Sequence, residues 1–137
     1  MRARVLREDP RDRWDGFVAS WPHFGLLQSS GWGDFKERSG WKVFRIGVEQ
    51  GDRLVAGAQM LVKQLPFAAA SLAYIPRGPL VDWGDREVVH ALLSGLHRVA
   101  REQRAIAVKI EPPVPQSPDA IGRLTSSGFR RSRFNSP

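Results

Sequence analysis

Cysteine is absent from the sequence. The protein therefore has no disulfide framework, and it has no thiolate to ligate a metal ion or act as a nucleophile. Histidine is scarce as well, with only His23, His90 and His97. His90 and His97 are seven residues apart, whereas a helical pair that grips zinc is four apart. We therefore predict no metal site and interpret the three histidines as surface or hydrogen-bonded polar residues.

Long hydrophobic runs are also missing. Residues 1–14 carry several charges and are not followed by the apolar core that a secretory signal needs. No stretch approaches the ~20 apolar residues of a membrane span. From these absences we predict a cytoplasmic protein with no membrane span.

Several catalytic and phosphate-binding motifs do not occur. The sequence lacks GxSxG, the serine elbow of hydrolases, and it lacks the phosphate loops GxxxxGK[ST] and GxGxxG. It also lacks the glycine-rich turn between strand and helix whose amides would hold the pyrophosphate of acetyl-CoA. These absences argue against a plain N-acetyltransferase, and we predict no bound cofactor.

Acidic residues are in the minority, 14 against 21 lysines and arginines, which gives a net charge of +7. Such a balance attracts nucleic acid, anionic lipid or phosphorylated metabolites. One interpretation is a basic nucleic-acid-binding module, and another is a solvated arginine-rich surface. The aromatic residues lie at core-like spacings and do not alternate with basic ones as stacking platforms would. The densest basic cluster lies near the end of the chain, at Arg123, Arg130, Arg131 and Arg133.

What is present is the pattern of a single mixed α/β domain over residues 1–137. The 42% hydrophobic and 26% charged residues are ordinary for a globular protein. Apolar periodicity predicts helices at 11–21, from Ser29 or Ser30 to about 40, after a cap at Asp85, and at 119–125. Strands are predicted at 2–6, 41–50, 53–65, 71–75 and 105–110, with another beginning at Phe129.

This order of elements predicts a mixed sheet flanked by helices, with the 41–65 hairpin at its centre. Trp32 and Trp41 are predicted as core anchors. Gly57, inside a strand, indicates a close backbone approach or a bulge. Lys109 and Glu111, one pleat apart, are predicted as a solvent-exposed pair.

Four phrases carry a more specific signal. They are LQSSGW (27–32), with Lys36 and Gly40-Trp41 behind it, AGAQMLV (56–62), YIPRGPLVDW (74–83) and AVKIEP (107–112). In this combination and order they resemble the amino-terminal half of the FemAB/FemX family of peptidoglycan aminoacyltransferases. The resemblance covers about residues 14–134.

The resemblance implies both a fold and an activity. Family members are similar to two acetyltransferase-like (GNAT) subdomains packed together, with a cell-wall precursor in a groove of the first. They transfer an amino acid from aminoacyl-tRNA to the stem peptide of a precursor such as UDP-MurNAc-pentapeptide or lipid II. The implied partners are therefore the precursor and the charged tRNA.

The resemblance also implies site residues. Lys36 matches a lysine that contacts the precursor's phosphates, a role that suits an ammonium on a flexible stem. Tyr74 and Arg77 fall in the loop that borders the groove and are candidates for substrate binding. Asp82 is a candidate for taking or relaying a proton when an amine attacks the tRNA ester. A solvated helix lysine at 36 and a turn-capping role for Asp82 remain open alternatives.

Family members have a second subdomain of comparable size. We therefore expect residues 1–137 to be a truncated, first GNAT-like half, and we do not expect this half to catalyse the reaction alone. The alternative is an interaction half-domain that pairs with itself or with a second chain. An unpaired strand edge near Phe129 and Phe134 is the predicted contact for such pairing.

Overall fold

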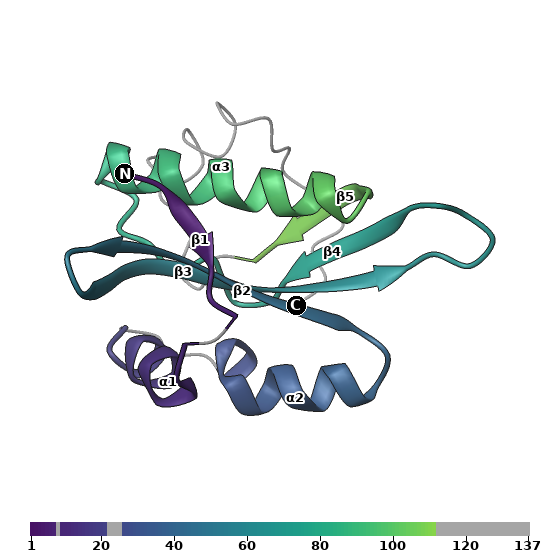
Figure 1. Ribbon diagram of the computed structural model, residues 1–137, viewed down its shortest axis with the longest axis horizontal. Coiled ribbons are helices and arrows are strands. Elements are labelled where there is room, and N and C mark those ends of the chain that lie inside the picture. Colours follow the sequence, from purple (N-terminus) through teal and green to yellow (C-terminus); the bar gives the residue numbers. More distant parts are fainter. Residues whose placement is uncertain (8, 22–25, 112–137) are drawn as a thin grey trace.

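The computed structural model describes residues 1–7, 9–21 and 26–111 (Figure 1). These residues form three layers, in which α3 (Arg86–Glu102) covers one face of a five-stranded sheet and two shorter helices cover part of the other. The shorter helices are α1 (Arg11–Ala19) and α2 (Ser30–Arg38), and the 3-10 helix η1 (Leu26–Gln28) precedes α2. The predictions at 119–125, Phe129, Phe134 and His23 lie outside the described residues.

The sheet has the strand order β1-β2-β3-β4-β5. Its strands are β1 (Ala3–Val5), β2 (Lys42–Gln50), β3 (Arg53–Gln64), β4 (Ser71–Ile75) and β5 (Ala105–Ile110). All neighbours are antiparallel except β4 and β5, which are parallel and are joined by α3. The mixed sheet and its β2–β3 hairpin are confirmed, with β3 in the middle of the sheet.

The predicted helix caps are also confirmed. Ser29 accepts a hydrogen bond from the backbone N–H of Trp32, and Asp85 accepts one from the N–H of Val88. Both bonds satisfy an amide that has no partner inside its own helix. The first helix ends at Ala19, two residues before the predicted end, and the N–H of Ser20 closes its last turn.

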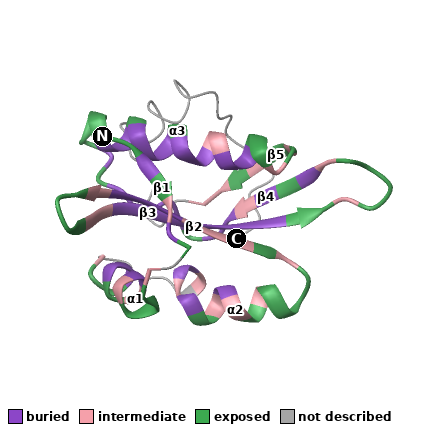
Figure 2. Cartoon of the chain, viewed as in Figure 1, coloured by how far each residue is buried: buried purple, intermediate pink, exposed green. Residues whose placement is uncertain are grey.

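Two apolar clusters form the core (Figure 2). The larger one packs the buried stripe of α3 against the sheet, with Leu92 and Leu96 beside Ile46 and Met60. The smaller cluster lies under α1 and consists of Leu6, Trp14, Phe17, Val18 and Leu80. The stripe predicted for the long helix is therefore its sheet-facing side.

Gly57 makes the close approach that its position in a strand indicates. A Cβ atom there would lie 2.9 Å from the ring of Trp14 and 3.0 Å from the carbonyl oxygen of Ile46. The ladder between β2 and β3 is regular at this residue, and its bulge lies at Val48/Glu49 instead. Of the two alternatives, the close approach is the correct one.

The prediction that Trp32 and Trp41 anchor the core is wrong. Both are half-buried and belong to neither cluster. The reason is the rotation of α2, which presents the buried residues Ser30 and Gly33 to the sheet. Successive residues of a helix are about 100° apart, so Trp32 points away from the sheet-facing side of α2, where it contacts Phe35 and Lys36.

Candidate functional site

Gln28 joins three of the sequence phrases in one buried contact. Its side-chain oxygen accepts a hydrogen bond from the backbone N–H of Gln59 (2.8 Å), and its Nε2 donates to the carbonyl of Pro76 (2.7 Å). The side chain is fully buried, and such a buried amide is stable only when its donors and acceptor are satisfied. Gln28 therefore ties the segment before α2 to β3 and to the loop that follows β4.

Gln59 extends this network under α2. Its Nε2 donates to the carbonyl of Ser29 (2.9 Å), and its Oε1 accepts from Arg45 Nε (2.9 Å). Burial lowers the pKa of Arg45, and the nearby Arg11 adds to this. Gly33 lets α2 lie directly on the amide, since a Cβ atom at 33 would be 2.6 Å from Gln59 Oε1. The start of α2 is thus fixed to the sheet.

The α2 face of the sheet continues past this helix as an open surface over β3, β4 and β5. Lys63 pairs with Leu72 and Leu72 with Ala107, while Tyr74 pairs with Lys109. Directly paired residues point to the same side of a sheet, and all five are exposed or half-buried. We call this the β3–β5 surface, made of Lys63, Leu72, Tyr74, Ala107 and Lys109.

Lys36 lies at the edge of the β3–β5 surface. Its Nζ is 5.2 Å from the ring centre of Trp32 and 5.8 Å from that of Trp41. Lys63 approaches Trp41 as well, at 5.3 Å. Within the described part of the chain, no carboxylate pairs with either lysine. Two cations therefore share an aromatic platform without a neutralising partner, an arrangement suited to an anionic ligand.

Tyr74 meets Glu111, a residue that the sequence did not single out as a site. The Tyr74 hydroxyl donates to Glu111 Oε1 at 2.5 Å. Burial, together with the Glu111 carboxylate, raises the pKa of Tyr74 to about 12, so the phenol keeps its proton at neutral pH. Lys109 Nζ lies 3.8 Å from Glu111. The predicted Lys109–Glu111 pair exists, and its glutamate is the more buried partner. The phrase AVKIEP was the available signal for Glu111.

Arg77 lies in the loop that leaves β4, close to Glu111. The backbone N–H of Glu111 donates to the carbonyls of Ile75 and Gly78, which places this loop against the end of β5. Arg77 is exposed and has a left-handed backbone (φ +58°). Its guanidinium has no hydrogen-bonding or ion-pair partner among the described residues.

Asp82 does not lie with the other candidates. Leu80 pairs with Gly57, four residues along β3 from Leu61, the partner of Tyr74. This separation corresponds to about 13 Å of strand, and Asp82 lies two residues further along the chain. Its Oδ1 accepts a hydrogen bond from the N–H of Gly84 (3.0 Å) in the turn before α3. The structure thus places Tyr74 on the β3–β5 surface, Lys36 at its edge and Arg77 in the loop after β4, whereas Asp82 lies in the turn before α3.

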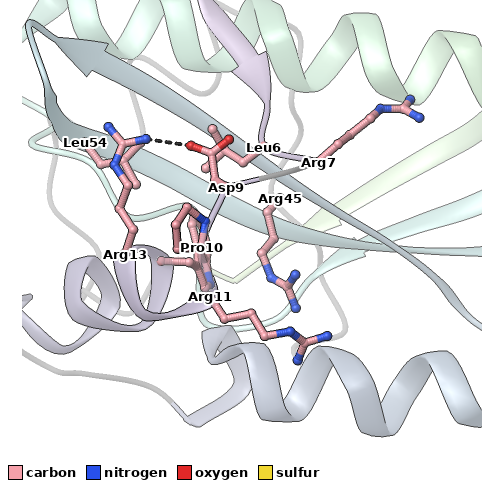
Figure 3. A pocket seen from close by; sticks show the side chains of 9 residues that line it. Leu6, Arg7, Asp9, Pro10, Arg11, Arg13, Arg45 and Leu54 are labelled. Carbon is pink, nitrogen blue, oxygen red and sulfur yellow. Dashed lines mark hydrogen bonds and ion pairs between the residues drawn. The ribbon is translucent and has the colours of Figure 1, made fainter.

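A cavity of about 110 Å³ lies apart from the β3–β5 surface, between the end of β1 and the start of α1 (Figure 3). Its charged lining is mostly paired: Arg13 binds Asp9 and Glu49, and Arg11 binds Asp34. Arg4 completes this network by binding Asp9 and Glu49 as well. None of the candidate site residues lines the cavity, so we interpret these ion pairs as fastening β1 and α1 to β2.

The ion pairs predict a loss of stability in acid. Hydrogen bonds from Arg4 and Arg13 lower the pKa of Glu49 from 4.5 to about 2. A depressed carboxyl pKa stabilises the fold above the unfolded value, and this stabilisation is lost as the pH falls through the folded value. Urea titrations between about pH 5 and pH 2 should therefore show a falling free energy of unfolding, and Glu49→Gln should flatten the fall.

Glu102→Gln, at an exposed position in the last turn of α3, is the matched control and should leave the slope unchanged. Equal slopes for Glu49→Gln and the unaltered chain would contradict a role for this network.

The family model for FemAB matches residues 10–127. Lipid II:glycine glycyltransferases from Staphylococcus epidermidis and Staphylococcus aureus are each 36% identical to the chain over 122 residues. The chain belongs to the FemAB family. The aligned part is 88% of this chain but 29% of each relative's length, so the chain spans under a third of these relatives.

Solved structures agree with the family and the fold. FemX superimposes with a TM-score of 0.85 and 33% identity, over 95% of this chain and 32% of the FemX chain. An acetyltransferase from Trypanosoma brucei matches with a TM-score of 0.65 and 17% identity, over 98% of this chain and 96% of its own. The second likeness confirms a GNAT-like fold and carries nothing on function. Among the described residues, this FemAB-family chain has no helix long and apolar enough to cross a bilayer.

Proposed function

We propose that the chain is the precursor-binding part of an enzyme that adds an amino acid to a peptidoglycan stem peptide. The observation that carries this proposal is the 36% identity to proteins named lipid II:glycine glycyltransferase, over 88% of the chain. The acceptor is lipid II or its nucleotide-linked counterpart UDP-MurNAc-pentapeptide, and the donor is aminoacyl-tRNA. We place the reaction in the cytoplasm, where tRNA is charged.

The β3–β5 surface and Lys36 supply the chemistry for binding such a precursor. Both precursor forms carry a diphosphate, and an ammonium on a flexible stem is a good partner for phosphate oxygens. Lys36 and Lys63 present two such groups beside Trp41. Arg77 adds a guanidinium in the loop after β4, and its planar fork suits a carboxylate of the stem peptide.

The reaction joins the amine of the acceptor peptide to the carbonyl carbon of the aminoacyl ester. A C–N bond forms, the C–O bond to the tRNA ribose breaks, and the ribose oxygen leaves with a proton. The amine must lose a proton on the way. Glu111 is a carboxylate beside the β3–β5 surface, where it accepts a hydrogen bond from the Tyr74 hydroxyl, and it is one candidate for accepting this proton. Asp82 remains the second candidate for this step, although its carboxylate already closes a turn.

Replacing Lys36 with alanine is expected to weaken binding of UDP-MurNAc-pentapeptide about fivefold, the loss of one exposed charge-assisted contact. Calorimetric titration of the full chain at low salt measures this, and we expect the starting affinity to be weak.

Lys42→Ala is the matched control. Lys42 is an exposed lysine soon after Lys36 in the chain, but it pairs with Val62 on the α3 side of the sheet. Tight binding that is insensitive to Lys36→Ala would show that the site lies elsewhere.

A further inference from the structure

The hairpin between β3 and β4 ends in an exposed apolar tip. Residues 65–70 read Leu-Pro-Phe-Ala-Ala-Ala, and the N–H of Leu65 donates to the carbonyl of Ala70 to close the loop (2.9 Å). Residues 66–69 are all exposed, and Phe67 is completely so. The hairpin projects beyond the helices on both faces of the sheet (Figure 1). Four consecutive exposed residues without a polar side chain are therefore presented to the surroundings.

The phenyl ring of Phe67 contributes nothing to the packing of the described domain. Phe67 packs in neither core cluster. Its backbone is left-handed (φ +63°), a conformation that glycine and asparagine adopt readily and a bulky side chain rarely does. An exposed apolar group that gives no stability and sits on an unfavourable backbone indicates contact with something outside the domain.

Basic residues surround the root of this hairpin. The register places Gln64 opposite Ser71 and Ser71 beside Ala105, so the ends of α2 and α3 lie at the same end of the sheet. Among the described residues at this end, the exposed cations outnumber the two exposed acids, Glu37 and Glu102. These cations are Arg38, Lys42, Lys63, Arg101 and Arg104.

We propose that the tip of the β3–β4 hairpin inserts into the surface of an anionic lipid bilayer. Phe67 and its apolar neighbours would enter the boundary between headgroups and acyl chains, where amphipathic segments place their apolar side. The cations at the root would meet the negative headgroups. Neither part suffices alone, because a single small apolar anchor gives only marginal membrane binding.

Lipid accounts for the whole feature better than RNA does. The cations suit either polyanion, but a tip of proline, phenylalanine and alanine offers no side-chain donor or acceptor to a nucleotide. Its apolar surface gains most from leaving water. Of the residues that carry this proposal, Lys63 alone also belongs to the β3–β5 surface. The tests at Phe67 leave that surface unaltered, so the two proposals can fail separately.

The absence of cysteine permits a direct test of insertion. Phe67→Cys carries an environment-sensitive fluorophore at the tip, and Asp52→Cys carries the same label in the β2–β3 turn at the opposite end of the sheet. With vesicles containing phosphatidylglycerol, the label at 67 should shift to the blue and brighten, while the label at 52 should not change. Vesicles of phosphatidylcholine alone should produce a much smaller response.

Binding strength provides the second readout. Phe67→Asn, which suits the left-handed backbone, should lower the vesicle partition coefficient of the full chain about tenfold, the order expected for one aromatic side chain. Ile106→Thr removes another exposed apolar side chain, on β5, and should have little effect. About 1 M salt should release the protein, because the Debye length then falls to about 3 Å.

Three results would overturn the proposal. The first is a label at 67 that stays water-like on vesicles that pellet the protein. The second is a response of that label to single-stranded RNA and not to vesicles, which would assign the tip to nucleic acid. The third is a response to protein concentration alone, which would assign it to a second copy of the chain.

Discussion

Replacing Gln28 with alanine is expected to lower the free energy of unfolding by about 3 kcal/mol, the sum expected when buried amide partners lose their hydrogen bonds and a cavity opens. The substitution strands the N–H of Gln59 and the carbonyl of Pro76, both in contact with a fully buried side chain. No water replaces the lost bonds unless the packing opens. Urea-induced unfolding followed by tryptophan fluorescence measures the change.

Gln64→Ala is the control for this substitution. Gln64 also makes two hydrogen bonds to backbone carbonyls, those of Ala68 and Ala70, but its side chain is exposed at the hairpin. Water can satisfy those carbonyls, so we expect a loss of less than about 1 kcal/mol. Equal losses for the two variants would mean that Gln28 does not hold α2, β3 and the loop after β4 together.

Two glycines of α2 are expected to respond to alanine with opposite signs. Gly33→Ala places a Cβ atom 2.6 Å from Gln59 Oε1 and 3.0 Å from an Arg45 nitrogen, where the buried network cannot move freely. We expect a loss of about 2 kcal/mol, as for other overpacked sites. Gly31→Ala meets nothing within 4 Å and should stabilise the helix by roughly 0.5–1 kcal/mol.

Thermal unfolding of both variants, recorded under the same conditions, tests this pair. The displacement of α2 by Gly33→Ala should also weaken precursor binding, because Lys36 is carried on the same helix. If Gly33→Ala were neutral, α2 would have to be able to slide on the sheet, contrary to the close contact described above.

Much of the fold was predictable because it depends on short stretches of sequence. Alternating apolar residues on either side of Gly51-Asp52 define the β2–β3 hairpin, and the left-handed backbone at Gly51 (φ +61°) is the local reason for the turn. Ser29 and Asp85 each cap a helix through the amide three residues away. Such interactions are complete within one turn of chain, so their residue types suffice to indicate them.

The candidate site was predictable only in part. Lys36, Tyr74 and Arg77 were indicated by the order of the family phrases; the structure places Tyr74 on the β3–β5 surface and Lys36 at its edge, with Arg77 in the loop after β4. Glu111 was not indicated as a site, because it is 37 residues from Tyr74 in the chain. The contact between Tyr74 and Glu111 requires β4 and β5 to be parallel neighbours. The α3 crossover produces this pairing, and the local pattern of apolar residues does not indicate it.

The sequence by itself determined the mixed α/β class, the helix starts, the central hairpin and the membership of the FemAB family. Only the tertiary structure decided which apolar residues form the core. Trp32 and Trp41 are large apolar residues of the type that anchors cores, yet Gly33 and Ser30 form the buried side of α2, and both tryptophans stay half-buried beside Lys36. Hydrophobicity specifies that a side chain gains by leaving water, but the packing of backbone on backbone selects which side chains do so.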